Sequence, residues 1–188
     1  MSNYAKIKNF DIANGEGISV SVFFSGCDKQ PKCKGCFNSD IWNYEVGEKF
    51  TDETIEDIIN KLSNPHIKSL ALLGGEPMAD KNVEDVLKLV KKVKSEFPNK
   101  KIWLWTWRKY ESLLIQIRGI GTMGLDGKIH PFPDNVRNSI LHYIDVLVDG
   151  RFIEKEKDLT LKWRGSKNQR IIDVQQSLAQ KKVVLYDE

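Results

Sequence analysis

The chain has 188 residues, of which 40% are hydrophobic and 29% are charged, and its formal net charge is +3 at pH 7. This length and balance fit a single globular domain over residues 1–188 and exclude a disordered chain. So small a charge does not indicate a nucleic-acid-binding protein. No apolar run approaches the ~20 residues that span a bilayer, and the N-terminus carries no secretory signal. We therefore expect a cytoplasmic protein that binds neither nucleic acid nor membrane.

Strands and helices are expected to alternate in the first half of the chain. Residues 18–25 are rich in β-branched and aromatic side chains, which predicts a strand. Thr51 is a suitable N-cap for a helix whose apolar residues recur at helical spacing as far as residue 62. The apolar run at 67–73 predicts a buried strand, and the apolar face at 83–97 predicts a longer helix.

The second half of the chain gives weaker signals. Residues 101–107 alternate, which predicts a strand with its three tryptophans on one side. A short helix is expected at 110–117, and the Gly- and Pro-rich stretch 119–133 is expected to be a loop. Residues 144–148 predict a last strand.

Together these elements predict an α/β fold with a mainly parallel sheet. Ligands of such sheets bind at the carboxyl ends of the strands. The cysteine-containing loop after 18–25 and the Gly-Gly-Glu-Pro turn at 74–77 both leave a predicted strand at that end. We therefore expect both loops to face the same ligand. Residues 151–188 form a charged C-terminal extension, which is a candidate surface for a partner.

The cysteines are three in number and lie within ten residues, as Cys27, Cys33 and Cys36. An odd number cannot pair completely as disulfides, and clustering of this kind favours metal ligation. Thiolates are soft ligands that suit iron–sulfur clusters and zinc. A structural zinc site would need a fourth ligand from elsewhere in the chain. Candidates for that ligand are a carboxylate, His66, His130 and His142.

The count of three thiols is informative in itself. A 4Fe-4S cube held by three cysteines leaves one iron with an open position, and a substrate binds at such a position. The amino group and carboxylate of S-adenosylmethionine would chelate that iron. One electron from the reduced cluster would then cleave the sulfonium and leave a 5′-deoxyadenosyl radical, which takes hydrogen from carbon. The hard chemistry would belong to the cofactors, and the protein would supply position.

With a Gly-Gly-Glu-Pro turn placed one βα unit after the cysteines, the sequence resembles the radical S-adenosylmethionine superfamily. In that superfamily an aromatic residue follows the third cysteine, and the turn contacts the methionine moiety. The resemblance implies a cluster on the three cysteines and cofactor-binding roles for Gly35, Cys36, Phe37, Gly74, Gly75 and Glu76. Thr106, near the end of strand 101–107, is a further candidate contact. The gap between Cys27 and Cys33 is two residues longer than the superfamily's usual spacing.

Longer stretches are similar to the anaerobic ribonucleotide reductase-activating proteins, and the similarity extends from about residue 9 to about residue 173. These stretches are 14–17, 36–38, 145–152 and 164–170. The resemblance implies an incomplete, open (β/α) barrel of the radical S-adenosylmethionine type. It also implies an activase whose radical takes hydrogen from a glycine near the C-terminus of an anaerobic ribonucleoside-triphosphate reductase. The implied partners are that reductase and a low-potential electron donor such as a flavodoxin.

Two other functions stay open on the sequence alone. One is the activation of a different glycyl radical enzyme, although such activases often carry an added cluster domain with further cysteines. The other is a non-catalytic iron–sulfur or zinc module that carries electrons or holds a partner. The stretch 164–170 either docks the reductase or forms a structural turn. The tryptophans at 103, 105 and 107 favour packing on a sheet face over stacking on bases.

Overall fold

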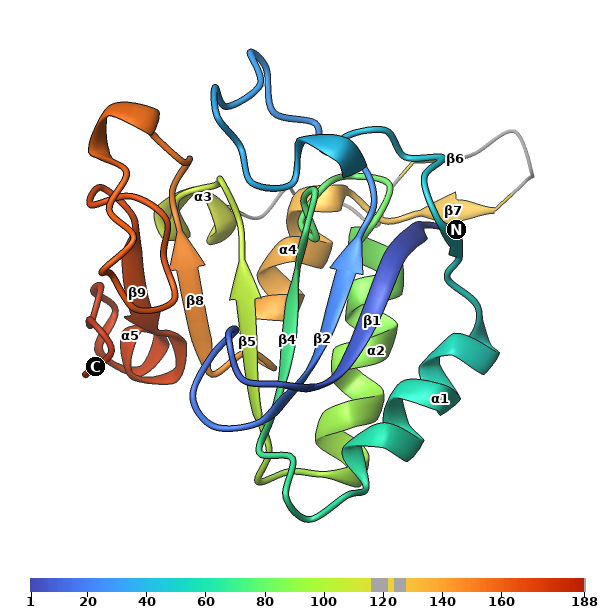
Figure 1. Cartoon of the computed structure of the whole chain (residues 1–188). Coiled ribbons are helices and arrows are strands. Elements are labelled where there is room, and N and C mark those ends of the chain that lie inside the picture. The colour runs from blue at the N-terminus through green and yellow to red at the C-terminus, as the bar shows by residue number, and fades with distance from the viewer. Residues whose placement is uncertain (116–121, 124–127, 188) are drawn as a thin grey trace.

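The computed structural model describes residues 1–115, 122–123 and 128–187. A seven-stranded open sheet forms its centre, in the strand order β3-β1-β2-β4-β5-β8-β9 (Figure 1). The strands are β1 (Asn3–Asp11), β2 (Ser19–Phe24), β3 (Glu48–Lys49), β4 (Ser69–Gly74), β5 (Lys101–Trp105), β8 (Val146–Asp149) and β9 (Arg170–Asp173). The four inner strands β2, β4, β5 and β8 run parallel, whereas β1, β3 and β9 are antiparallel to their neighbours.

Five α-helices accompany the sheet in the described part of the chain. They are α1 (Asp52–Leu62), α2 (Val83–Glu96), α3 (Tyr110–Leu113), α4 (Pro133–Leu141) and α5 (Val174–Gln180). Two short 3-10 helices cover Ser39–Ile41 and Glu154–Glu156, and a small antiparallel pair joins β6 (Thr122–Met123) to β7 (Ile129–His130). No described helix is long and apolar enough to cross a membrane.

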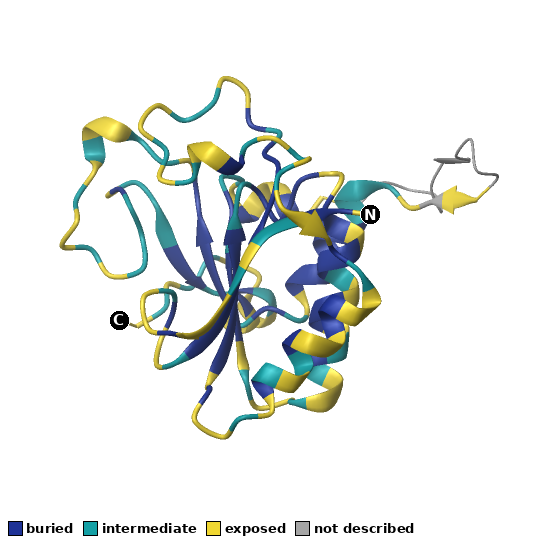
Figure 2. Cartoon of the chain, turned by 45° about the vertical axis from the view of Figure 1, so that its right-hand side comes forward, coloured by how far each residue is buried: buried dark blue, intermediate teal, exposed yellow. Residues whose placement is uncertain are grey.

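The alternation of side chains along the strands gives the sheet two different faces. On one face, residues such as Val22, Leu72 and Leu104 join the apolar stripes of the helices in the main core. Figure 2 shows the central strands and the inward sides of the helices as mostly buried. On the other face, Leu73 and Trp105 belong to two smaller apolar clusters that loops rather than helices cover.

Local sequence explains where α1 begins. The Thr51 hydroxyl accepts a hydrogen bond from the Thr54 amide, and the Thr54 hydroxyl accepts one from the Thr51 amide. This reciprocal cap satisfies two amide donors that the first turn of a helix leaves unpaired. Acidic Asp52 and Glu53 follow in that turn, where the helix dipole favours negative charge. The predicted N-cap is confirmed.

The α/β class, the parallel centre of the sheet and its openness are confirmed, and the barrel itself stays a prediction. The sequence did not predict β1, β9 or α4. The prediction for 119–133 was wrong where β6, β7 and the start of α4 fall within it, and the rest of that stretch lies outside the described residues. The helix expected at 110–117 is present as the shorter α3, and residues 116–117 lie outside the described residues. Strand β5 ends at Trp105, so Trp107 does not share a strand face with the other two tryptophans.

Candidate functional site

The two loops that were expected to face one ligand meet at a cavity of about 140 Å³, which we call the cysteine cavity. It lies at the carboxyl ends of β2, β4, β5 and β8, at the top of the sheet in Figure 1. Most of the predicted site residues line it: Cys27, Cys33, Cys36, Gly74, Gly75, Glu76 and Thr106. The structure therefore brings together residues that are distant in sequence, and it leaves Gly35 and Phe37 just outside this cavity.

The cysteine loop is anchored directly after β2. The Gly26 amide donates to the Ile41 carbonyl at 2.9 Å, and the Cys27 amide donates to the Trp42 carbonyl at 3.1 Å. Cys27 is buried, whereas Cys33 and Cys36 are half-buried. Burial raises the pKa of the Cys27 thiol to about 11. Binding of a metal or cluster would therefore have to displace a proton that this thiol holds firmly.

In the long segment between the first two cysteines, lysine side chains bond to backbone carbonyl groups of the same segment. The Lys29 ammonium donates to the carbonyl oxygens of Gln30 and Pro31, at 2.9 and 3.1 Å. The Lys32 ammonium donates to the Cys27 carbonyl oxygen. Lys29 is only 8% exposed and also lines the cysteine cavity. These bonds hold the longer loop compact and bring positive charge beside the thiols.

The turn after β4 requires glycine for close packing against the cysteine loop. A Cβ atom on Gly75 would lie 2.2 Å from the Gly26 carbonyl oxygen, and one on Gly74 would lie 2.4 Å from the Phe24 carbonyl oxygen. The Gly75 amide donates to that Phe24 oxygen at 2.8 Å, and the Asn38 side chain donates to the Gly74 carbonyl at 3.0 Å. The two loops therefore form one unit.

Glu76 lines the cysteine cavity, and its side chain is almost fully buried. Its oxygens accept hydrogen bonds from the Met78 amide at 2.8 Å, the Thr106 hydroxyl at 2.7 Å and the Trp107 amide at 3.0 Å. Burial raises the pKa of Glu76 to about 7, against the effect of these donors. The Thr106 hydroxyl therefore donates its hydrogen bond to Glu76, and the two side chains join the ends of β4 and β5.

Phe37 and Gly35 lie on the outer side of the cysteine loop. The Phe37 ring is 57% exposed and lies 5.1 Å from the Phe152 ring, centroid to centroid. Phe37 lines a second cavity of about 650 Å³. This larger cavity shares Cys36, Asn38, Leu73, Trp105, Phe152 and Gln169 with the cysteine cavity. The two cavities therefore adjoin, and together they offer more room than a cluster alone requires.

The sequence stretch 164–170 forms a clamp on the loop after β8. The Gln169 side chain accepts from the Gly165 and Ser166 amides and donates to the Gly150 carbonyl at 3.0 Å. Arg170 bonds both the buried Asp149 carboxylate and Glu111. The interpretation of this stretch as a structural turn therefore accounts for most of its polar side chains.

Sequence reasoning missed Asn38, Phe152 and Gln169 as cavity residues. Asn38 lies two residues after the third cysteine, and Phe152 lies three residues after the end of β8, so their places in loops that follow strands were available signals. Two of the histidine candidates for a fourth zinc ligand lie elsewhere: His66 precedes β4 at its amino end, and His142 caps the end of α4.

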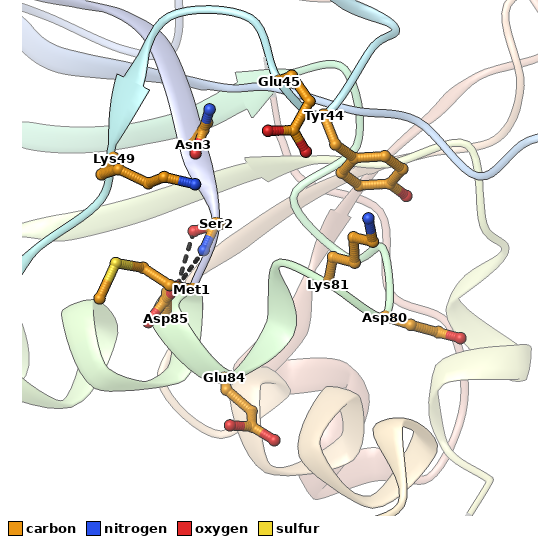
Figure 3. Close-up of a pocket in the computed structure, with 10 residues that line it drawn as sticks. All are labelled: Met1, Ser2, Asn3, Tyr44, Glu45, Lys49, Asp80, Lys81, Glu84 and Asp85. Atoms are coloured by element: carbon orange, nitrogen blue, oxygen red, sulfur yellow. Dashed lines mark hydrogen bonds between the residues drawn. The ribbon is translucent and has the colours of Figure 1, made fainter. Parts of the chain in front are cut away.

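A separate cavity of about 350 Å³ lies beside the start of β1 and α2 and contains none of the predicted site residues (Figure 3). Its walls carry charges of both signs, including Glu45, Lys49 and Lys81. The Ser2 amide and hydroxyl both donate to Asp85, at 2.7 and 2.8 Å. These bonds tie the first residues of β1 to α2, so this cavity borders a structural junction.

The donor set around the cysteine cavity suits an iron–sulfur cube. In the described part of the chain, no three His, Cys, Asp or Glu side chains are gathered closely enough to share one metal ion. The three thiols nevertheless line one cavity with Lys29 beside them, and soft thiolates next to a positive charge suit the iron and the negative charge of such a cluster.

Comparison with known proteins assigns the chain to a class and then to a family. The family model described as a 4Fe-4S single cluster domain matches residues 13–172. No solved structure matches the chain. The chain is 40% identical over 171 residues to the anaerobic ribonucleoside-triphosphate reductase-activating protein of Vibrio cholerae, covering 90% of this chain and 96% of that protein.

Further relatives carry the same name. The Haemophilus influenzae protein is 39% identical over 90% of this chain and 96% of its own length. The protein of phage T4 is 37% identical over 90% of this chain and 92% of its own length. These matches agree with the chain's three-cysteine loop, and the class is that of single-cluster 4Fe-4S proteins. The chain belongs to the family of anaerobic ribonucleoside-triphosphate reductase-activating proteins.

Proposed function

We propose that this protein activates an anaerobic ribonucleoside-triphosphate reductase by means of a 4Fe-4S cluster and S-adenosylmethionine. The observation that carries the proposal is the convergence of three cysteines and the Gly74–Glu76 turn on one cavity. When bound, the reduced cluster would supply the electron that cleaves S-adenosylmethionine, and the resulting 5′-deoxyadenosyl radical would take hydrogen from a C-terminal glycine of the reductase. The names of the relatives support the choice of that reductase as the partner.

The chain's own residues would bind and position these groups. Cys27, Cys33 and Cys36 would provide three thiolate ligands and leave one iron free for the amino acid end of the cofactor. Gly74 and Gly75 carry no Cβ, which lets the turn pack directly on the Phe24 and Gly26 backbone, so the turn would hold the cofactor beside the cluster. The turn is itself held in place by Asn38 and by the Glu76 network.

The larger cavity supports a macromolecular substrate. It opens beside Cys36 and Trp105 and extends over the loop-covered face of the sheet. Exposed apolar side chains, among them Phe37 and Leu159, stand at its edge. A glycine-bearing segment of the reductase would enter here, and its backbone would approach the cysteine cavity from the side that the helices leave open. No general base is required, because the hydrogen is taken by a radical and not as a proton.

The cluster and cofactor are tested in the isolated protein. Anaerobic reconstitution with iron and sulfide should give a brown protein with four irons per chain, and dithionite with S-adenosylmethionine should then yield 5′-deoxyadenosine. Cys36→Ala should lose both properties. Lys34→Ala is the matched control, since Lys34 lies in the same loop with its side chain 88% exposed. A brown protein that never forms 5′-deoxyadenosine would overturn the cofactor, and a colourless protein with one zinc would overturn the cluster.

The partner is tested separately. The reconstituted protein should produce a glycyl radical signal, seen by electron paramagnetic resonance, on an anaerobic ribonucleoside-triphosphate reductase from the same organism. Cys36→Ala should abolish that signal and Lys34→Ala should keep it. A signal on a different glycyl radical enzyme, with none on the reductase, would reassign the partner while leaving the cluster chemistry intact.

A further inference from the structure

Three aromatic rings lie in a continuous chain of contacts from the cysteine cavity to the other end of the sheet. Trp105 lines the cysteine cavity at the carboxyl end of β5. Its ring stacks on the fully buried Trp103 with centroids 5.8 Å apart and planes 22° apart. Trp103 in turn meets the half-buried Tyr186 edge-on, at 5.3 Å. We propose that Trp105, Trp103 and Tyr186 form a path that carries oxidising equivalents away from the cavity to Tyr186.

The surroundings of the two indoles favour onward transfer. The Trp103 Nε1–H is buried and has no hydrogen-bond partner. The Trp105 Nε1–H donates to the Trp163 backbone carbonyl at 2.7 Å. A carbonyl is a very weak base, so neither indole, once oxidised, has a group nearby to take its proton. An oxidised indole that keeps its proton remains a strong oxidant, and the hole passes on instead of being trapped.

The surroundings of Tyr186 favour its oxidation to a neutral tyrosyl radical. Its hydroxyl donates to the Glu16 carboxylate at 2.8 Å and accepts a hydrogen bond from the Lys101 ammonium at 2.7 Å. Lys101 also pairs with Glu16 at 2.9 Å. The hydrogen bond from Lys101 lowers the pKa of Glu16, so this carboxyl is ionised at neutral pH. A phenol becomes far more acidic when it loses an electron, and here a carboxylate is in place to receive the proton.

An oxidant at the Trp105 edge takes one electron from Trp105. Trp105 then takes one electron from Trp103, and Trp103 takes one from Tyr186. The Tyr186 O–H bond breaks, its proton moves to Glu16, and the products are a neutral tyrosyl radical and a protonated carboxyl group. If the oxidant is a carbon-centred radical, it also takes a proton from water in the open cavity and ends with a new C–H bond, and the hydroxide ion left behind is neutralised by the solvent.

The benefit to the protein rests on the proposed function, because that function supplies the radical. A radical formed without a reductase glycine in reach would attack the cysteines or the surrounding backbone. The aromatic path would move the oxidising equivalent to the half-exposed Tyr186 at the far end of β5, where soluble thiols can reduce the tyrosyl radical. Trp107, which bonds Asp28 through its indole at 3.0 Å, lines the same cavity but is not part of this path.

The path can be tested without cluster or S-adenosylmethionine. In the full-length chain with Cys27→Ser and Cys33→Ser, the remaining Cys36 is labelled with a ruthenium photosensitiser at the cavity edge. Flash oxidation of the label should yield a tyrosyl radical, detected by transient absorption and electron paramagnetic resonance with ring-deuterated tyrosine. Tyr186→Phe should abolish that signal and leave a tryptophan radical, and Glu16→Gln should slow its formation. Trp103→Phe should lower its rate by an order of magnitude or more.

Trp107→Phe is the matched control and should leave the rate unchanged. Circular dichroism must show that each variant is folded, and the exposed Glu16 and half-buried Tyr186 keep the test meaningful if Trp103→Phe is unstable. A tyrosyl signal that persists in Tyr186→Phe would overturn the proposal, as would equal rates in Trp103→Phe and the parent. Either result would say nothing against the activase function, which is measured by 5′-deoxyadenosine and glycyl radical formation.

Discussion

The two faces of the central sheet are built from the same strands but differ in what covers them. On the helix-covered face, Leu70, Leu72 and Ile102 are fully buried within one large apolar core. On the opposite face, Phe23, Leu73 and Trp105 lie in small clusters beneath loops, and two adjoining cavities open there. Alternate residues of one strand therefore have different structural roles. One set stabilises the fold, and the other shapes the site.

This difference explains how a chain of 188 residues combines a stable scaffold with an accessible site. Helices α1, α2 and α4 all pack on one side, so burial of apolar surface there supplies most of the folding free energy. The loops on the other side are held mainly by hydrogen bonds in which the Asn38 and Gln169 side chains donate and the Glu76 carboxylate accepts. Substitutions should therefore separate stability from site integrity according to the face they reach.

The largest difference is expected between the neighbours Leu72 and Leu73, which point to opposite faces of β4. Leu72 is fully buried in the helix-covered core, so Leu72→Ala should lower the free energy of unfolding by about 2–5 kcal/mol. Leu73 already borders both cavities, so Leu73→Ala should cost less than about 2 kcal/mol. Urea unfolding of the cluster-free protein measures both. Equal losses would show that the two faces contribute alike.

A smaller effect on stability, but a specific one on the site, is expected for Gly75→Ala. The new Cβ would collide with the Gly26 carbonyl oxygen, which is backbone and cannot turn away. Such overpacking costs about 1–3 kcal/mol and should displace the cysteine loop, so cluster reconstitution should fail. Gly17→Ala is the control, because Gly17 has a positive φ of 77°, which Gly75 lacks, and only the Lys68 side chain lies near its Cβ position. It should lose some stability and keep the cluster, and failure of both variants would point to general misfolding.

The sequence predicted the parts of this comparison that depend on local pattern. The cap at Thr51, the buried strand before Gly74 and the stripe of α2 follow from residue spacing, and the structure contains all three. Strands β1 and β9 were not predicted because their side chains alternate weakly and they gain stability by pairing, β1 between β2 and the short β3, and β9 at the edge beside β8. Tertiary contacts decide such elements.

The site could be predicted in composition but not in arrangement. The cysteines and the Gly74–Glu76 turn were found from spacing and from the rule that ligands sit at strand ends. The hydrogen bond that the Thr106 hydroxyl donates to Glu76 was not foreseeable, because it joins residues thirty positions apart. The clamp formed by Gln169 was not foreseeable either, since its charged neighbours in sequence resemble a solvated surface.

The clamp gives the next prediction. The Gln169 side chain makes four hydrogen bonds that hold the loop beside the cysteine cavity, so Gln169→Ala should cost about 1–3 kcal/mol. Lys167 lies in the same stretch with its side chain 67% exposed and makes a 3.5 Å ion pair with Asp158. Lys167→Ala should therefore change stability by at most about 1 kcal/mol. Thermal unfolding compares the two, and a larger loss for Lys167→Ala would contradict the interpretation of the stretch as a clamp.

The smallest effect concerns the outer edge of the sheet, where α3 meets β9. The hydrogen bonds from Arg170 lower the pKa of Glu111 to about 2, below its ordinary value of 4.5. A carboxyl whose pKa falls on folding stabilises the folded state above its unfolded pKa. That contribution is lost as the pH falls from about 4.5 towards 2. Because the Glu111 side chain is 56% exposed, solvent screening keeps the contribution small.

Glu111→Gln tests this edge through the pH dependence of stability. The variant should be slightly less stable than the parent at pH 7, and the difference should shrink as the pH is lowered below 4.5. Urea unfolding across that range gives the comparison. The variant should leave cluster reconstitution unaffected, because Glu111 lines neither the cysteine cavity nor the larger cavity beside it. A difference that grows on acidification would mean that the Arg170 pairing does not persist in solution and that Asp149 alone holds this arginine.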